Sequence, residues 1–204
     1  MDYEKQILAI KDTADKVVLH KVTVVTGNNG SGKSMLRKLV GFYLADKLGL
    51  PEKSVCTAQT SMQQRTELRS DFGALSSAMH DDGTNPTSSE TLHKIKQLIA
   101  VCKEDNKRFL IIDEPEIGMG EEMVAALVIF LNEQFKEFPV GCLGVMIITH
   151  NRYIVNNLNG EFLNMEGKTK DEWINREIIP TNLIQFEEDS LGLYRAIQSK
   201  LNKK

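Results

Sequence analysis

Cysteine is scarce in this chain, and its spacing excludes several kinds of site. The three cysteines, Cys56, Cys102 and Cys142, are far apart and form no Cys-x-x-Cys pair. Disulfide frameworks and cysteine-ligated metal sites need cysteines at close or regular spacing. The pattern predicts instead that the thiols are buried in a protein of a reducing compartment, and it offers no metal site.

Long hydrophobic runs and an excess of positive charge are also missing. No uninterrupted apolar run reaches the roughly 18 residues of a membrane-spanning helix, so we expect no membrane span. The first residues, 1–5, are charged and unlike a signal peptide, which favours a cytoplasmic protein. The net charge of −3 excludes an overall basic field for nucleic acid, although it leaves a local basic patch open.

The rest of the composition is ordinary. The chain has 204 residues, of which 41% are hydrophobic and 26% are charged. These values are typical of a globular protein with a buried core. We therefore expect residues 1–204 to form a single domain.

The most specific motif lies near the N-terminus. Residues 27–34 read Gly-Asn-Asn-Gly-Ser-Gly-Lys-Ser and match the phosphate-binding loop (P-loop) pattern G-x-x-x-x-G-K-[ST]. A β-branched apolar run precedes them, and apolar residues at helical spacing follow. The predicted nucleotide-binding residues are Gly27, Asn28, Asn29, Gly30, Ser31, Gly32, Lys33, Ser34 and Met35.

Such a strand–loop–helix unit explains how a triphosphate is bound. Backbone N–H groups of the loop point at phosphate oxygens, and the helix dipole favours their negative charge. We expect Lys33 to reach the β- and γ-phosphates and the Ser34 hydroxyl to bind Mg²⁺. A chance glycine-rich turn is the alternative, and the strand before the loop makes it remote.

Two acids follow a second apolar run. Residues 109–112 are apolar and are followed by Asp113 and Glu114. A buried parallel strand would deliver both carboxylates at its carboxyl end, beside the P-loop. Asp113 is predicted to hold Mg²⁺ and Glu114 to act as the general base on the attacking water. An acidic helix cap at a solvated strand end is the simpler alternative.

A third apolar run, residues 145–148, ends in Thr149 and His150. A histidine at that place could hydrogen-bond the γ-phosphate or the attacking water. The alternative is a structural histidine that caps the strand.

Strands alternate with helices along the rest of the chain, which predicts an α/β fold of the P-loop NTPase type. We expect a mostly parallel central sheet with helices on both faces, and a small polar and helical subdomain at residues 59–105. The predicted strands are 6–11, 17–26, 54–58, 108–113, 144–149, 162–165 and 177–179. The predicted helices are 35–48, 89–104, 121–135 and 191–201.

The three motifs, in this order, resemble the ATP-binding-cassette (ABC) class of P-loop ATPases over residues 17–155. The Asp-Glu-Pro-Glu run at 113–116 resembles soluble SMC-, RecF- and overcoming-lysogenization-type ATPases more than transporter cassettes. The resemblance implies that Glu114 is the catalytic base and His150 the switch histidine. It also implies a glutamine that senses Mg²⁺ and water; Gln59 is the first candidate, followed by Gln63 and Gln64.

The chain departs from that family at the signature motif. Ser88 and Ser89 stand about 25 residues before Asp113, where the family has a glycine-rich signature. As helix N-caps they could contact a γ-phosphate across a dimer, but plain N-capping explains them equally well. The 44 residues from Gln64 to Lys107 leave no room for coiled-coil arms.

The resemblance implies an ATPase with ATP and Mg²⁺ as ligands, whose nucleotide state drives formation of a homodimer or heteromer and engagement of protein or DNA. Arg65 and Arg69 lie in the polar segment suited to a partner. Tyr3 is a weak candidate for stacking on the base. A small-molecule kinase and a nucleotide-gated regulatory protein with negligible turnover are the alternatives; no Arg-rich lid supports the kinase.

Overall fold

The computed structural model describes residues 8, 11–12, 15–17, 19–28, 31–33, 35–37, 39–40, 55–59, 87–102, 107–177, 184, 188, 191–192 and 195. For Gln59 and Ser88 it describes the backbone alone. Several predicted functional residues lie outside the described residues: Tyr3, Asn29, Gly30, Ser34, Gln63, Gln64, Arg65 and Arg69.

A five-stranded sheet forms the centre of the protein, and every described strand pair is parallel. The strands are β1 (Val22–Thr26), β2 (Val55–Gln59), β3 (Arg108–Asp113), β4 (Cys142–Ile148) and β5 (Glu161–Asn164). Their order across the sheet is β2-β3-β4-β1-β5. The predicted α/β fold with a parallel sheet is therefore confirmed.

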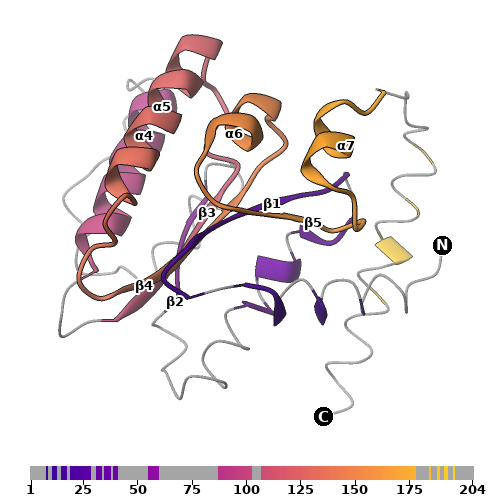
Figure 1. The fold of residues 1–204 in the computed structure, drawn as a ribbon, viewed down its shortest axis with the longest axis horizontal. Coiled ribbons are helices and arrows are strands. Elements are labelled where there is room, and N and C mark those ends of the chain that lie inside the picture. Colours follow the sequence, from indigo (N-terminus) through magenta and orange to yellow (C-terminus); the bar gives the residue numbers. More distant parts are fainter. Residues whose placement is uncertain are drawn as a thin grey trace.

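Helices cover both faces of this sheet (Figure 1). The named helices are α4 (Thr87–Ala100), α5 (Glu121–Gln134), α6 (Arg152–Asn157) and α7 (Lys170–Ile174). They pack on one face, where Leu110 and Ile147 are fully buried. Leu36 and Val40, in the helical residues after the P-loop, pack on the other face with Ile111. Successive residues of a strand therefore pack alternately into two cores, one on each face of the sheet, as expected for buried parallel strands.

Two sequence predictions near the N-terminus were wrong. Residues 6–11 were expected to form a strand, but Leu8 and Lys11 are helical. A short apolar run does not distinguish a strand from a helix. The strand expected at 17–26 begins only at Val22, because His20 has a φ of 57° and interrupts the extended backbone.

Other expectations fared better. Cys102 and Cys142 are buried free thiols, as expected. Leu191, Gly192 and Arg195 are helical, in agreement with a helix at 191–201.

The strand expected at 177–179 lies almost wholly outside the described residues. In the described part of the chain, no helix is both long and apolar enough to span a bilayer.

Candidate nucleotide site at the carboxyl edge of the sheet

The three motifs meet because their strands are neighbours. β4 lies between β1, which carries the P-loop, and β3, which carries the acids. Hydrogen bonds continue past the strand ends: the Thr149 N–H donates to the Val25 carbonyl at 3.1 Å, and the Glu114 N–H donates to the Ile148 carbonyl at 2.8 Å. The P-loop, the histidine segment (Thr149 and His150) and the acidic segment (Asp113 to Glu116) therefore leave the same edge of one sheet.

Lys33 is the buried cation of this edge. Its side-chain nitrogen donates to the carbonyls of Gly27 at 3.0 Å and of Asn28 at 2.8 Å, inside the loop itself. The residue is only 7% exposed. Burial lowers the pKa of Lys33 to about 8, against the opposing charges of Glu114, Glu166 and Asp113. The phosphates of a nucleotide would add further negative charge beside this ammonium group.

Asp113 lies at the end of β3 and pairs with a cation from the helical residues after the P-loop. Its Oδ2 is 3.5 Å from Nη1 of Arg37. Burial raises the pKa of Asp113; Arg37 opposes the rise and Glu114 adds to it. The carboxylate therefore faces the P-loop helix, which is the side from which a phosphate-bound metal ion would approach.

Glu114 leaves the strand with an unusual backbone. Its φ is 49°, in the left-handed region that residues other than glycine adopt at a cost of about 1 kcal/mol. The turn brings its Oε1 to 3.6 Å from Nε2 of His150. Strain of this kind is concentrated at functional sites, where the surrounding structure enforces it.

His150 is neutral at physiological pH. Burial, followed by the charges of Lys33 and Arg176, lowers its pKa to about 4. A neutral imidazole can accept one hydrogen bond and donate another, which suits contact with a water molecule or a phosphate oxygen. Its 3.6 Å approach to Glu114 is therefore a contact with a carboxylate and not a strong ion pair.

Glu116 joins the acidic segment to the histidine segment. Its Oε1 accepts hydrogen bonds from the Thr149 hydroxyl at 2.6 Å and from the His150 N–H at 3.1 Å. Burial raises the pKa of Glu116, while these hydrogen bonds oppose the rise. Its Oε2 is buried with no hydrogen-bond partner among the described residues. The Asp-Glu-Pro-Glu run contains Glu116, but its sequence gives no sign of this contact.

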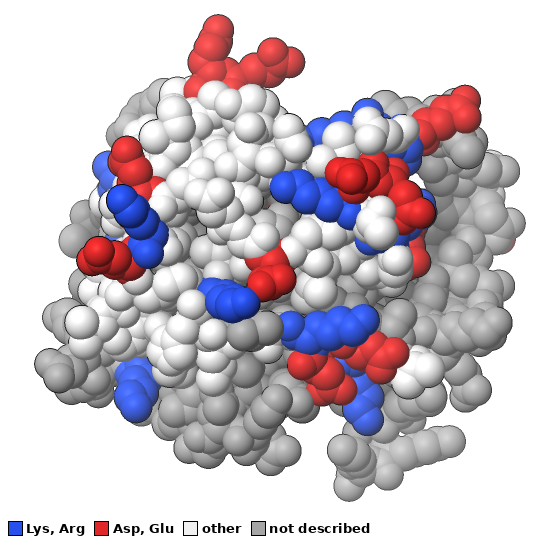
Figure 2. Space-filling model, in the orientation of Figure 1, with Lys and Arg blue, Asp and Glu red and all other residues white. Residues whose placement is uncertain are grey.

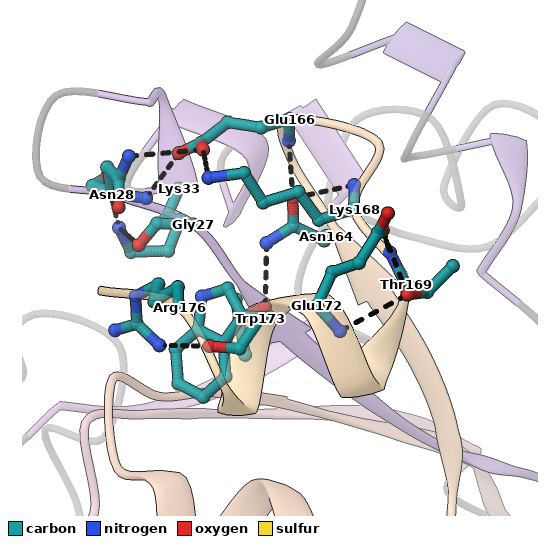
Figure 3. Close-up of polar contacts among 11 residues, drawn as sticks. Gly27, Asn28, Lys33, Asn164, Glu166, Lys168, Thr169, Glu172, Trp173 and Arg176 are labelled. Atoms are coloured by element: carbon teal, nitrogen blue, oxygen red, sulfur yellow. Dashed lines mark hydrogen bonds and ion pairs between the residues drawn. The ribbon is translucent and has the colours of Figure 1, made fainter. Parts of the chain in front are cut away.

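A turn after β5 holds the beginning of the P-loop (Figure 3). The Glu166 carboxylate accepts hydrogen bonds from the Asn28 N–H at 2.7 Å and from its Nδ2 at 3.1 Å. Lys168 pairs with the same carboxylate at 2.9 Å. Nothing in the local sequence indicates this role, because it depends on the parallel pairing of β5 with β1.

The other predicted residues fall as follows. Gln59 is the last residue of β2, and its backbone is in register with Asp113 on β3. The two serines lie inside α4, so the prediction that Ser88 or Ser89 is its N-cap was wrong. Ser89 is exposed. Met35 is partly buried against the core beneath the P-loop helix.

The donor set fits a magnesium ion bound together with a nucleotide. In the described residues no group of three or more His, Cys, Asp or Glu side chains could hold a metal by itself. Mg²⁺ is commonly held by one or two carboxylates together with phosphates and water, and not by an all-protein cage. Asp113 supplies one such carboxylate at the right edge of the sheet.

Charges of both signs mix on the face seen in Figure 2, over the residues that the structure describes. Among the exposed pairs of the described residues, Lys21 and Glu161 lie 2.7 Å apart. The described residues of the face in Figure 2 therefore form no broad basic field of the kind that binds nucleic acid without sequence preference.

Comparisons with known proteins agree with this geometry at the level of a family. The sequence model described as "AAA domain" matches residues 19–148, from the entrance of β1 to the end of β4. No curated protein sequence matches the chain.

Solved structures with a similar arrangement have low sequence identity. A nucleotide-free ATP-binding cassette of an ABC transporter is 15% identical, with a TM-score of 0.43, over 73% of this chain and 78% of that one. C. elegans PCH-2 is 15% identical, with a TM-score of 0.39, over 84% of this chain and 42% of that one. A chain of the E. coli MS115-1 HORMA:CdnC:Trip13 complex is 12% identical, with a TM-score of 0.40, over 80% and 56%.

Proposed function

Because the chain belongs to the AAA-domain family and is a P-loop NTPase domain, we propose that it binds Mg-ATP and hydrolyses it to ADP and phosphate. One observation carries the proposal. Three adjacent parallel strands lead to Lys33, Asp113, Glu114 and His150 at a single edge, where the charge of Lys33 acts on the other three side chains. ATP is preferred over GTP because the sequence has no guanine-reading N/T-K-x-D motif.

Phosphate binding is the role of the P-loop. Backbone N–H groups of the P-loop bind the phosphate oxygens, and Lys33, whose ammonium group donates to the carbonyls of Gly27 and Asn28, neutralises the β- and γ-phosphates. Ser34 and Asp113 hold Mg²⁺, with Gln59 sensing it from the neighbouring β2. The ion, when bound, supplies charge neutralisation at the phosphate oxygens.

Glu114 acts as the general base. It takes a proton from the attacking water as the oxygen of that water bonds to the γ-phosphorus and the bond to the ADP oxygen breaks. His150 lies 3.6 Å from it, is neutral, and orients the water or the γ-phosphate. A carboxylate and an imidazole that lie 3.6 Å apart on neighbouring strand ends need little reorganisation for the reaction.

The proposal that this chain associates with a second copy or a partner is based on its resemblance to SMC-, RecF- and overcoming-lysogenization-type ATPases. ATP would bring two copies, or this chain and a partner protein, together, with Ser88 and Ser89 of one chain near the nucleotide of the other. Both serines lie in the first turn of α4, where free N–H groups favour anions. The proposed consequence is ATP-dependent engagement of a protein or DNA partner in the cytoplasm.

The function is tested by ATP turnover of the wild type and of Glu114→Gln. We expect the wild type to release phosphate and Glu114→Gln to lose turnover at least about 100-fold, the usual contribution of a general base. Glu137→Gln, an exposed change, is the control.

Binding and light scattering complete the test. Glu114→Gln is expected to keep its ATP affinity and to associate when Mg-ATP is present. Phosphate transfer to a nucleoside monophosphate would favour a kinase instead. Turnover that is close to zero in both proteins, with ATP still bound, would favour a regulatory nucleotide-binding module.

A further inference from the structure

Arg37 stands beside the proposed metal-binding carboxylate, in the helical residues that follow the P-loop. The P-loop pattern ends at Ser34 and does not include it. Nη1 of Arg37 lies 3.5 Å from Oδ2 of Asp113, and the two side chains are 11% and 20% exposed. A cation this close and this well screened from water acts on any other ion that approaches the same carboxylate.

The fold fixes both ends of this ion pair. Side chains two residues apart on a strand lie on the same face of the sheet, so Asp113 stands on the face where Ile111 packs. Ile111 and Leu36 share one core cluster. Leu36 is fully buried, and its N–H donates to the Gly32 carbonyl at 2.8 Å. The next residue is Arg37, so core packing under the P-loop helix brings the guanidinium to the carboxylate.

The charges around Asp113 balance one another. The positive charge of Arg37 has the largest electrostatic effect on the pKa of Asp113. Smaller effects of opposite sign come from Glu114 and Lys33. Two cations therefore oppose two carboxylates at this edge of the sheet. The ammonium group of Lys33 donates to two carbonyls of its own loop, whereas the guanidinium of Arg37 lies at ion-pair distance from Asp113.

This balance has a consequence for a divalent ion. Mg²⁺ is commonly held by one or two carboxylates together with phosphates. Without phosphates, the ion would meet the Asp113 carboxylate and the Arg37 guanidinium together, and repulsion by the guanidinium would offset much of the attraction. The phosphates of a nucleotide add negative charge and shift the balance toward the metal.

We propose that Arg37 is the internal counter-ion of Asp113 and makes metal binding depend on the nucleotide. The protein then accepts the metal–triphosphate complex and rejects the free ion. This inference rests on the proposed function, since it takes Asp113 as the metal-binding carboxylate. Arg37 acts through Asp113 and is therefore a positioning residue that determines which form of the metal is bound.

The test uses Mn²⁺ alone, without nucleotide, as the probe. Electron paramagnetic resonance measures free Mn²⁺ during titration of the full chain, at a mildly alkaline pH so that a proton does not replace the metal on Asp113. Arg37→Gln should bind Mn²⁺ at least about 10-fold more tightly than the wild type. Even at the dielectric constant of water, a unit positive charge a few ångströms away weakens the binding of a dication by about that factor.

Two further variants separate charge from structure. Adding Asp113→Asn to Arg37→Gln should abolish the gain in Mn²⁺ affinity. Arg37→Lys keeps a positive charge and should bind Mn²⁺ about as weakly as the wild type, although it loses the planar guanidinium. A purely structural role of Arg37 would not produce a gain of metal affinity that depends on Asp113.

Lys21→Gln is the matched control. It also removes a cation from a carboxylate, because Lys21 lies 2.7 Å from Glu161, but both of these side chains are about half exposed. A single exposed carboxylate does not make a metal site, so Mn²⁺ affinity should stay that of the wild type.

Two outcomes would overturn the inference. One is a folded Arg37→Gln protein that binds Mn²⁺ no more tightly than the wild type. The other needs no Arg37 variant to fold: it is a wild type that binds Mn²⁺ tightly without nucleotide and loses this binding in Asp113→Asn.

The outcome is distinguishable from that of the proposed function. If Arg37→Gln gains no Mn²⁺ affinity while the wild type hydrolyses ATP, the function stands and the role of Arg37 falls. If Arg37→Gln gains Mn²⁺ affinity through Asp113 but the wild type neither binds nor hydrolyses ATP, the proposed function falls and the effect of Arg37 on metal binding stands.

Discussion

The carboxylate of Glu116 accepts a hydrogen bond from the hydroxyl of Thr149 at 2.6 Å and thereby joins the turn after β3 to the turn after β4. The same oxygen accepts the N–H of His150 at 3.1 Å. Glu114 stands two residues earlier in one turn and His150 stands in the other, so Glu116 links the turn of the proposed base to the turn of its histidine.

Glu116→Ala should therefore impair the site as well as the fold. Loss of the two hydrogen bonds leaves the Thr149 O–H and the His150 N–H without their acceptor, which should cost about 1–3 kcal/mol in the free energy of unfolding. We expect a lower kcat with KM for ATP changed little, since the P-loop is untouched. Urea unfolding and steady-state kinetics measure the two effects.

Glu137→Ala, at an exposed carboxylate, is the control for Glu116→Ala and should match the wild type. Glu116→Gln keeps an oxygen acceptor and should recover most of the lost stability. A Glu116→Ala protein with full stability and full kcat would show that the link between the two turns is dispensable.

His150 predicts a pH effect whose sign follows from its pKa. The folded protein holds the pKa at about 4, below the ordinary 6.5, chiefly through burial. Between these pH values the unfolded chain binds more protons at this residue, so stability falls as the pH falls from 6.5 to 4. His150→Gln removes this contribution. Its stability should decline less than that of the wild type between pH 7 and pH 5, measured by urea unfolding.

His93→Gln serves as the control for that comparison, because His93 is exposed on α4. Its pH dependence should follow the wild type. Parallel pH dependence for the wild type and His150→Gln would contradict a lowered pKa for His150.

The sequence was sufficient for the parts of the site that are local in the chain. Lys33, Asp113 and His150 each follow an apolar run that becomes a buried parallel strand, and the carboxyl ends of such strands meet at one edge. The hydrophobic periodicity and the composition of the sequence were therefore enough to predict both the fold and these residues. The ends of the elements could not be predicted as closely: β1 begins at Val22 and not at residue 17, because His20 has a left-handed backbone.

The contacts that hold the site together could not be found in this way. Glu166 and Asn28 are 138 residues apart, and only the pairing of β5 with β1 brings them into contact. The short helix α7, which positions Arg176, begins with a capping box between Thr169 and Glu172. That signal was available in the sequence, but five residues carry too little apolar periodicity to identify a helix.

Glu166→Ala tests whether the turn after β5 supports the P-loop. The change removes the acceptor of the Asn28 N–H at 2.7 Å and of its Nδ2 at 3.1 Å. A looser loop entrance should raise KM for ATP about 3- to 10-fold, the effect of a net hydrogen bond of about 1 kcal/mol, with kcat changed little. Glu161→Ala, at the start of β5, breaks only the exposed pair with Lys21 and should leave KM unchanged.

Gly27→Ala tests how closely the P-loop must approach the turn after β5. A Cβ at this position would lie 2.5 Å from Oγ of Ser31 and 3.0 Å from Cβ of Met165. Met165 is fixed from the other side, because its N–H donates to the Thr26 carbonyl at 2.9 Å. Because the Met165 backbone is held in this way, the added methyl group should overpack the contact and cost about 1–3 kcal/mol in the free energy of unfolding.

The added methyl group should also displace the loop backbone, so ATP affinity should fall together with stability in Gly27→Ala. Gly120→Ala is the matched control: it adds the same methyl group before α5, where no atom lies within 4 Å of the new Cβ. Thermal unfolding and ATP titration of both variants decide the matter. If Gly27→Ala is as stable as Gly120→Ala and binds ATP as well, the P-loop does not depend on this close approach to Met165.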